Sequence, residues 1–556
     1  MLRRSSCFRI WMVASSCAVA FACAAERKAP QPPPRAVSVP DVRTRADEPP
    51  HLTLAWTPEY EAAVGDMEVF EVLGDGRWNP LVVGPSYALG QKIRDDILRQ
   101  PSVVVPDERG VLAVRFDVEA RKWQAPVRIE PAASTHHGTV EVRTSRNAKG
   151  DVLFMLERLN SDQIWTNRFD AERGTWDGAV WLAEFPRGHS RLVTVTHGSD
   201  GAFRAIWEEG KQIRHGDYRA DQRAWTESAA LGTGHEFFAT ATIDTTLRTI
   251  VAWQDGFRLS AARQRSPVGS FDVPTVIQAL SPSDTKPSPM TKAIALAWYP
   301  ELVALAQDDA MLVWAIARPL ESDGPWVSLF DSATNRWTAP EYVGVGDWKT
   351  TELADSVTST VTSSGDVVLH WATKAPLPGN WGREQRWARA HDPRSARFGE
   401  AASCAAVEGA QASSPVGTVG FRALPLRDGR VLTVWMTAPD DPQKLTGQGL
   451  NACIFDPRTA TWTKAVELER ATARVEHFDA VIADCGAVTV AWSDEKDGQV
   501  YARRLEPGVE GWTPAEGVGQ AKKLWLLPAG DCGATLVTAS PGKLIARVFG
   551  EPAASR

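Results

Sequence analysis

Short segments in which apolar and polar residues alternate run along most of the chain beyond residue 50. The clearest set is separated by short links such as Ser-Asp-Gly. It consists of four segments rich in β-branched or aromatic residues: 190–198, 202–210, 211–219 and 224–232. A period of two is typical of β-strands, and links this short join strands in antiparallel order. The pattern therefore predicts a four-stranded antiparallel sheet.

A short aromatic motif indicates that this unit is repeated. A Phe-Asp pair is followed, six residues after the Asp, by Trp at four places: Phe116-Asp117 to Trp123, Phe169-Asp170 to Trp176, Phe330-Asp331 to Trp337, and Phe455-Asp456 to Trp462. Looser copies are Tyr218-Arg219 to Trp225, His391-Asp392 to Phe398, and Leu505-Glu506 to Trp512. A repeat of about 50 residues holds four short strands, and copies of such a unit build a ring or a stack.

The repeated residues are interpreted as packing and turn residues. We expect the Phe to face inward on the third strand, the Asp to accept hydrogen bonds from the following turn, and the Trp to open the fourth strand. A second Trp ends most second strands: Trp207, Trp253, Trp314, Trp371, Trp435 and Trp492. Two Trp residues in a unit fill the space between facing sheets. A catalytic role does not suit the repeated Asp, because one reaction needs one site.

The fold class that follows is all-β, a single β-propeller of four-stranded antiparallel blades over residues 51–556. Full blades begin near residues 137, 190, 235, 294, 353, 419 and 475. Residues 521–550 contain three more strands, so a strand from 52–130 has to complete the last blade and close the ring through both termini. This count favours eight blades, and the irregular pattern of 52–130 leaves seven or nine open.

The first 24 residues are typical of an export signal, because Arg residues precede a short apolar run that ends at Ala24. Cys23 resembles the lipidated residue of a bacterial lipoprotein signal, and the preceding Ala-Phe-Ala also fits a signal peptidase site. Residues 25–50 are rich in Pro and lack an apolar pattern, which predicts a disordered tether. We expect an outer-membrane lipoprotein of the bacterial cell envelope, attached to the membrane through its lipid only, or a secreted protein.

Charge narrows the partner classes. The formal net charge is -7, and the region after the signal has no run of Lys or Arg, so the chain lacks the basic footprint of a nucleic-acid-binding protein. We expect a monomer whose partner is a protein or a glycan.

The blade pattern resembles a widespread group of propeller repeats. Gly-x-aliphatic-x-x-x-Trp, then the aromatic-Asp strand and Trp-Thr-x-Pro, is similar to the repeats of exported bacterial propeller proteins, most of them of unassigned function. Signal, tether and ring together resemble the layout of non-catalytic outer-membrane assembly lipoproteins with eight blades. The element from Asp170 to Trp176 lacks the spacing of the sialidase Asp-box, and the chain lacks the adjacent Cys pair of quinoprotein dehydrogenases. The resemblance implies the fold and does not imply an activity.

Three consecutive blades have long links between their second and third strands, near 316–326, 372–387 and 436–451. These links open on the face where propellers usually bind ligands. Their aromatic and charged residues suit contacts with a protein or a sugar: Trp326, Lys374, Trp381, Trp387, Asp440, Asp441 and Lys444. The alternative interpretation is that they are surface insertions without a partner.

His137, His189 and His235 stand at the same distance before the second-strand Trp position in three consecutive blades. Equal register places them at the channel mouth, where neutral imidazoles can share a divalent metal. Some propeller polysaccharide lyases hold a metal with channel histidines. A metal-assisted lyase or hydrolase acting on a polysaccharide is therefore the alternative to a non-catalytic binding protein without a cofactor. The histidines are otherwise turn residues copied with the repeat.

The cysteines beyond the signal form an even set. Cys485 and Cys532 both occur as Asp-Cys-Gly-Ala at the same turn of successive blades, where a disulfide is geometrically feasible. Cys404 and Cys453 are the remaining pair. Four cysteines of this kind suit an oxidising compartment.

Overall fold

Strands form the regular structure of the residues that the computed structural model describes. These residues run from Trp56 to Gly550 with gaps, of which the longest are 88–105, 280–295, 405–420 and 437–448. Within them no helix is long and apolar enough to cross a membrane. The expected export signal, Cys23 and the tether lie outside the described residues.

Nine antiparallel sheets, called blades 1 to 9, follow one another along the described chain. Blade 1 consists of β2 (Glu71–Gly74), β3 (Pro80–Tyr87), β4 (Pro106–Asp117), β5 (Lys122–Trp123) and β6 (Val127–Arg128). Blade 2 consists of β7 (Val140–Arg146), β8 (Val152–Arg158), β9 (Gln163–Asp170), β10 (Thr175–Trp176) and β11 (Val180–Glu184). Blade 3 consists of β12 (Ser190–His197), β13 (Phe203–Glu209), β14 (Gln212–Arg219), β15 (Ala224–Trp225) and β16 (Ala229–Thr233).

The middle blades continue this order. Blade 4 consists of β17 (Ala239–Ile243), β18 (Thr249–Asp255), β19 (Arg258–Arg263) and β20 (Thr275–Ala279). Blade 5 consists of β21 (Leu296–Ala304), β22 (Ala310–Arg318), β23 (Glu321–Asp331), β24 (Arg336–Trp337) and β25 (Glu341–Tyr342). Blade 6 consists of β26 (Glu352–Leu353), β27 (Thr358–Val361), β28 (Val367–Lys374), β29 (Glu384–Asp392), β30 (Arg397–Phe398) and β31 (Ala402–Ser403).

The last blades include β1, the first strand of the described residues. Blade 7 consists of β32 (Phe421–Pro425), β33 (Val431–Met436), β34 (Leu450–Asp456), β35 (Thr461–Trp462) and β36 (Val466–Glu469). Blade 8 consists of β37 (Val475–Ile482), β38 (Val488–Asp494), β39 (Gln499–Leu505) and β40 (Glu516–Gln520). Blade 9 consists of β41 (Lys523–Ala529), β42 (Gly533–Ser540), β43 (Lys543–Phe549) and β1 (Tyr60–Ala63).

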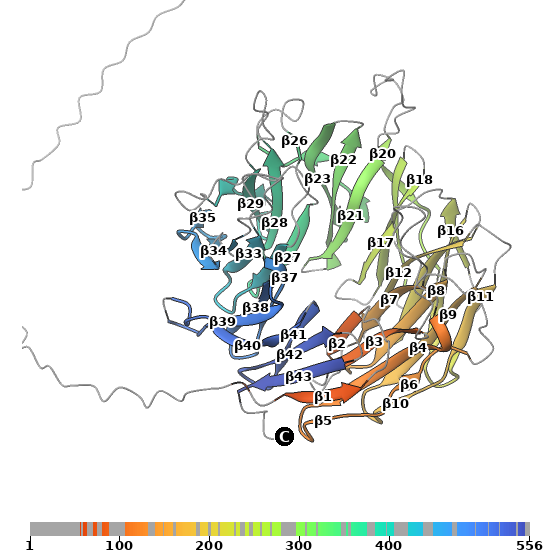
Figure 1. Ribbon diagram of the computed structural model, residues 1–556. Coiled ribbons are helices and arrows are strands. Elements are labelled where there is room, and N and C mark those ends of the chain that lie inside the picture. The colour runs from red at the N-terminus through yellow and green to blue at the C-terminus, as the bar shows by residue number, and fades with distance from the viewer. Residues whose placement is uncertain are drawn as a thin grey trace, which may run out of the picture. The chain divides into compact units, whose positions relative to one another are not determined.

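The ring closes through the two ends of the described chain, as predicted. β1 pairs antiparallel with β43, with Tyr60 opposite Ala546, and is the outer strand of blade 9. Figure 1 shows the orange-red β1 beside the blue β43. The indole N–H of Trp123 in blade 1 donates to the Tyr60 carbonyl at 2.8 Å and so ties the closing strand to the next blade. Closure of this kind leaves no open seam in the ring.

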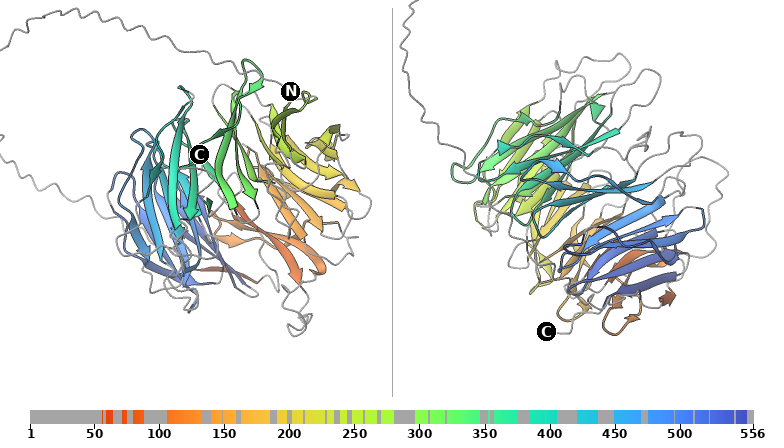
Figure 2. Two further views of the ribbon diagram at one scale, coloured as in Figure 1. Left: turned by 90° about the horizontal axis from the view of Figure 1, so that it is seen from above. Right: turned by 90° about the vertical axis from the view of Figure 1, so that its left-hand side faces the viewer.

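The core lies in the seams between neighbouring blades, which stand side by side around a common axis (Figures 1 and 2). In each seam buried apolar side chains of both blades form a cluster. Ile206 of blade 3 and Trp253 of blade 4 share one such cluster, and Leu544 of blade 9 shares another with Phe116 of blade 1. All nine seams are filled in this way. Because both faces of a sheet are covered, a second strand such as β33 is buried at every position.

The ring has nine blades, a count that the sequence left open, and not the favoured eight. Residues 71–128, expected only to complete the last blade, form the whole of blade 1 in addition to the separate closing strand β1. The long stretch between β3 and β4, which includes 88–105, interrupts the alternation that marks the other blades. This blade therefore keeps the Phe116-Asp117 to Trp123 motif but lacks the regular spacing of the strands before it.

The repeated motif has the structural role that the sequence predicts. The Phe and Trp rings of each of the four strict copies touch, with centroids 5.0 to 5.3 Å apart. The Asp accepts hydrogen bonds from the turn that follows: the N–H of Ala333 donates to Asp331 at 2.9 Å, and that of Arg458 donates to Asp456 at 2.9 Å. These bonds fix the hairpin that places the Trp.

The antiparallel strands divide the connections into two sets. Turns between first and second strands and between third and fourth strands open on one side, called here the turn face. Links between second and third strands, and the crossings to the next blade, open on the other side, called the link face.

Candidate functional site

The link face of blade 5 carries a hairpin where a loop was predicted. β22 and β23 remain paired as far as Arg318 and Glu321, with a bulge beyond Trp314. Trp326 consequently lies inside β23 and not in a link. The pairing continues because both strands stay extended beyond Trp314.

Trp326 and Trp387 occupy equivalent places in third strands. They lie opposite Trp314 and Trp371, respectively. The Trp326 ring is 5.6 Å from that of Tyr342. Trp326 and Trp387 are both partly buried against seam clusters. Each ring therefore has a packing role, and only its exposed part is accessible to a partner.

The remaining predicted residues are placed only in part. Lys374 is the last residue of β28, opposite Glu384. The others lie outside the described residues: Trp381, Asp440, Asp441, Lys444, His137, His189 and His235. Among the residues that are described, no group of three His, Cys, Asp or Glu side chains is close enough together to hold a metal.

Carboxylates on the innermost strands join neighbouring blades near the axis. Glu301 on β21 accepts hydrogen bonds from the Ser359 hydroxyl at 2.7 Å and from the Ser359 backbone N–H at 3.0 Å, on β27 of the next blade. Burial raises the pKa of the Glu301 carboxyl, and the two hydrogen bonds oppose that rise. The contact fixes the first strand of blade 6 against that of blade 5.

Asp479 makes the corresponding contact across three blades. It accepts the backbone N–H of Leu526 in blade 9 at 2.9 Å and the Arg422 Nε of blade 7 at 3.0 Å. A side chain that reaches the first strands on both sides has to point toward the axis, so Asp479 lies on the channel wall. The side chain of Arg422 is 53% exposed, whereas that of Asp479 is 16% exposed.

The Arg422–Asp479 pair suits recognition of polar groups. The guanidinium offers several N–H donors in a planar fork, and the carboxylate beside it is an acceptor held in place by blade 9. A few fixed polar groups next to aromatic residues are typical of ligand sites. Phe421 and Phe478, the residues directly before this pair in the chain, point to the opposite sides of their strands and pack into the seams.

The sequence reasoning missed this pair, although a signal was present. Arg422 and Asp479 each follow a Phe that lies opposite the second-strand Trp. A charged residue stands at this register in each of these two first strands. Because Arg422 and Asp479 occupy the same register in neighbouring blades, the two charged residues could have been recognised as channel residues.

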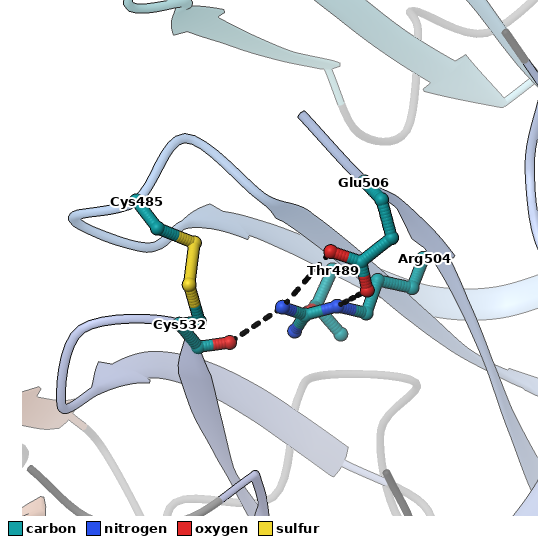
Figure 3. The surroundings of a disulfide bond; sticks show 5 residues. All are labelled: Cys485, Thr489, Arg504, Glu506 and Cys532. Atoms are coloured by element: carbon teal, nitrogen blue, oxygen red, sulfur yellow. Dashed lines mark hydrogen bonds and ion pairs between the residues drawn. A yellow bond between two sulfur atoms is a disulfide. The ribbon is translucent and has the colours of Figure 1, made fainter. Parts of the chain in front are cut away.

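Two disulfides join neighbouring blades. Cys485 and Cys532, at turns on the turn face of blades 8 and 9, are bonded with their Cα atoms 5.2 Å apart. Figure 3 shows Arg504 beside them, donating to the Cys532 carbonyl at 2.5 Å and paired with Glu506. The second disulfide, with Cα atoms 7.0 Å apart, connects Cys404 of blade 6 to Cys453 of blade 7. Both pairings are those that the sequence suggested.

Comparisons with known proteins leave the chain in a broad class. No protein-family model and no curated protein matches it. Matching solved structures include the polysaccharide lyase Uly1, at 9% identity and a TM-score of 0.42 over 89% of this chain and 99% of that one. The Dos1 propeller matches at 10% identity and 0.40 over 75% and 96%, and a eukaryotic initiation factor at 9% and 0.43 over 81% and 96%. The nine blades place the chain among the β-propellers, a class that includes both enzymes and binding proteins.

Proposed function

We propose that this chain is an exported, lipid-anchored propeller that binds a protein or a glycan at the bacterial cell envelope, without a catalytic activity or a cofactor. The observation that carries the proposal is the fixed Arg422–Asp479 pair on the channel wall, with Arg422 in blade 7, which carries one of the predicted binding links, and Asp479 in the neighbouring blade 8. The turns of the opposite face are closed by their own side chains, as at Asp331. The channel wall thus offers a partner more accessible hydrogen-bonding groups than these turns do.

Export is supported by the disulfides. Two bonds between neighbouring blades stabilise the ring only where thiols become oxidised, as in the periplasm or outside the cell. Attachment through Cys23 and the Pro-rich tether would then hold the propeller away from the bilayer.

The binding surface is tested with variants of both faces. The immobilised protein is used to capture its partner from an envelope extract, and the affinity of that partner is then measured. We expect Trp381→Ala combined with Arg422→Ala to weaken binding at least tenfold, because aromatic and Arg side chains carry most of the energy of an interface. Arg394→Ala is the matched control, since this Arg is 84% exposed on the turn face. Loss of binding in the control and not in the double variant would move the interface to the turn face.

The alternative function is a metal-assisted enzyme acting on a polysaccharide, and the equal register of His137, His189 and His235 is what favours it. Metal analysis of the purified protein separates the two functions. Stoichiometric metal that is lost in His189→Ala supports the enzyme. A protein that binds its partner while free of metal rejects it.

A further inference from the structure

A histidine is buried in the interface between blades 6 and 7, called seam 6/7. His370 on β28 is 2% exposed, and its ring lies 5.6 Å from that of Phe421 and 6.4 Å from that of Trp462, both in blade 7. Neither ring nitrogen has a hydrogen-bond partner in the described part of the chain. Equivalent residues of other second strands are apolar, for example Ile206 and Val313, so packing alone does not require an imidazole here.

The closed seam opposes a second positive charge. Arg386, 8% exposed, lies on the same face of blade 6 as His370, and its guanidinium carbon is 4.8 Å from the centre of the Phe421 ring. The residues that face His370 from the strands of blade 7 carry no charge: Phe421, Thr433, Cys453 and Trp462. Burial, and then the charge of Arg386, lower the pKa of His370 to about 3.

The seam contains a second polar side chain that is not satisfied. Thr433 of blade 7 is 1% exposed, and its hydroxyl has no partner among the described residues. A buried polar group without a hydrogen bond costs free energy that water entry would recover. The closed seam thus holds two groups, His370 and Thr433, that gain hydrogen bonds when it opens.

A covalent bond crosses the same seam. Cys404 of blade 6 and Cys453 of blade 7 are 6% and 2% exposed, and they pack with Trp435 in the seam cluster. Opening can therefore separate the apolar surfaces of the two blades locally while the blades stay joined.

We propose that seam 6/7 is an acid-sensitive joint, in which protonation of His370 favours an open arrangement that water enters and that the Cys404–Cys453 disulfide keeps from coming apart. Blades 6 and 7 carry two of the three links predicted to bind a partner, so the joint would couple pH to the relative placement of these links. The direction of the pH dependence follows from the number of protons that the closed and the open seam bind. The closed seam holds His370 neutral and the open seam does not, so opening becomes more favourable as the pH falls below about 6.5, the ordinary value of an exposed His.

The magnitude can be stated as a population. The ratio of open to closed seam rises about tenfold for each pH unit below 6.5, which amounts to ~30-fold between pH 7.5 and pH 5.0. The effect is complete near pH 3, where the closed form also binds the proton.

Reduction of the buried disulfide reports the opening. The full chain is treated with a phosphine reductant, which is active at both pH values, and the free thiols of each pair are alkylated and quantified by mass spectrometry. When opening is fast, the rate follows the open population. Cys485–Cys532 in the seam of blades 8 and 9 is the internal reference. We expect the reduction rate of Cys404–Cys453, relative to this reference, to rise ~30-fold from pH 7.5 to pH 5.0.

Three variants make the test specific. His370→Val restores an aliphatic residue, and His370→Gln keeps a polar side chain that cannot take a proton at these pH values; both should abolish the rise. His391→Phe, which alters a buried histidine on the other face of blade 6, should keep it. A wild-type ratio that does not change with pH, or a rise that survives in both His370 variants, overturns the proposal. So does equal acceleration of both disulfides, which would indicate unfolding of the whole ring.

Discussion

Arg204 is the residue at which a single substitution should disturb the seam between blades 3 and 4 most clearly. It lies on β13 and is 7% exposed. Its Nε and Nη2 donate to the two carboxylate oxygens of Asp217 at 2.5 and 2.8 Å. Its Nη1 crosses the seam to Thr249 Oγ1, at 2.5 Å, and to Gln264 of blade 4. Arg204→Met keeps the apolar stem and removes every one of these donors.

The expected cost comes from the groups left behind. Asp217, whose side chain is 18% exposed, loses both donors of its carboxylate, whereas Gln264 keeps the Thr249 backbone N–H at 3.3 Å. Removing one partner of a buried ion pair typically costs 3 to 5 kcal/mol. Because Asp217 retains some contact with water, we expect a loss of about 3 kcal/mol in the free energy of unfolding. Arg204→Met combined with Asp217→Leu should recover most of it, because no unpaired charge remains.

Equilibrium urea unfolding, followed by Trp fluorescence, measures these differences. Arg265→Met is the matched control, since Arg265 and Asp272 form a pair at 3.0 Å whose side chains are 61% and 32% exposed. Exposed pairs contribute below about 1 kcal/mol. If Arg204→Met cost no more than Arg265→Met, or if the double variant were less stable than the single one, the seam would not depend on this ion pair.

Three further outcomes are expected. Burial lowers the pKa of His215 to about 4 and that of His370 to about 3, so the unfolded chain binds more protons than the folded chain below pH 6.5. The free energy of unfolding should therefore be about 4 kcal/mol lower at pH 5 than at pH 8, and equal stability at the two pH values would contradict this. Cys485→Ser opens a disulfide of sequence separation 47 and should cost about 3 to 4 kcal/mol, seen as a lower melting temperature; an unchanged one would show that the bond is dispensable. Trp123→Phe removes the hydrogen bond to the Tyr60 carbonyl, costs about 1 kcal/mol, and should speed hydrogen exchange of residues 59–63; unchanged exchange would mean that β1 is held by β43 alone.

The local pattern was sufficient for the blades but not for their number. Alternation and turn residues act over a few positions, so the strands of blade 3 and the hairpin from Asp331 to Trp337 were predictable. Blade 1 was missed because the stretch between β3 and β4 separates its strands along the chain. Pairing of β3 with β4 across that stretch depends on contacts with the neighbouring blades 9 and 2, between which blade 1 packs.

The candidate site was predictable only as a region. The long links predicted a binding region on blades 5 to 7. The positions of Trp326 and Trp387 within strands depend on how far the hairpins stay paired. Arg422 and Asp479 are 57 residues apart and belong to different blades, so no local rule connects them.

The sequence by itself determined the repeated four-stranded unit, the motif that caps its turns and the closure of the ring. Each of these follows from short-range preferences or from spacing that recurs along the chain. Only the tertiary structure decided that nine blades close the ring, that Arg204 reaches Gln264 over 60 residues, and that His370 lies unpartnered by any described residue beside Arg386. The physical reason is that seams are formed by residues of separate repeats, whose contacts depend on the curvature of the whole ring.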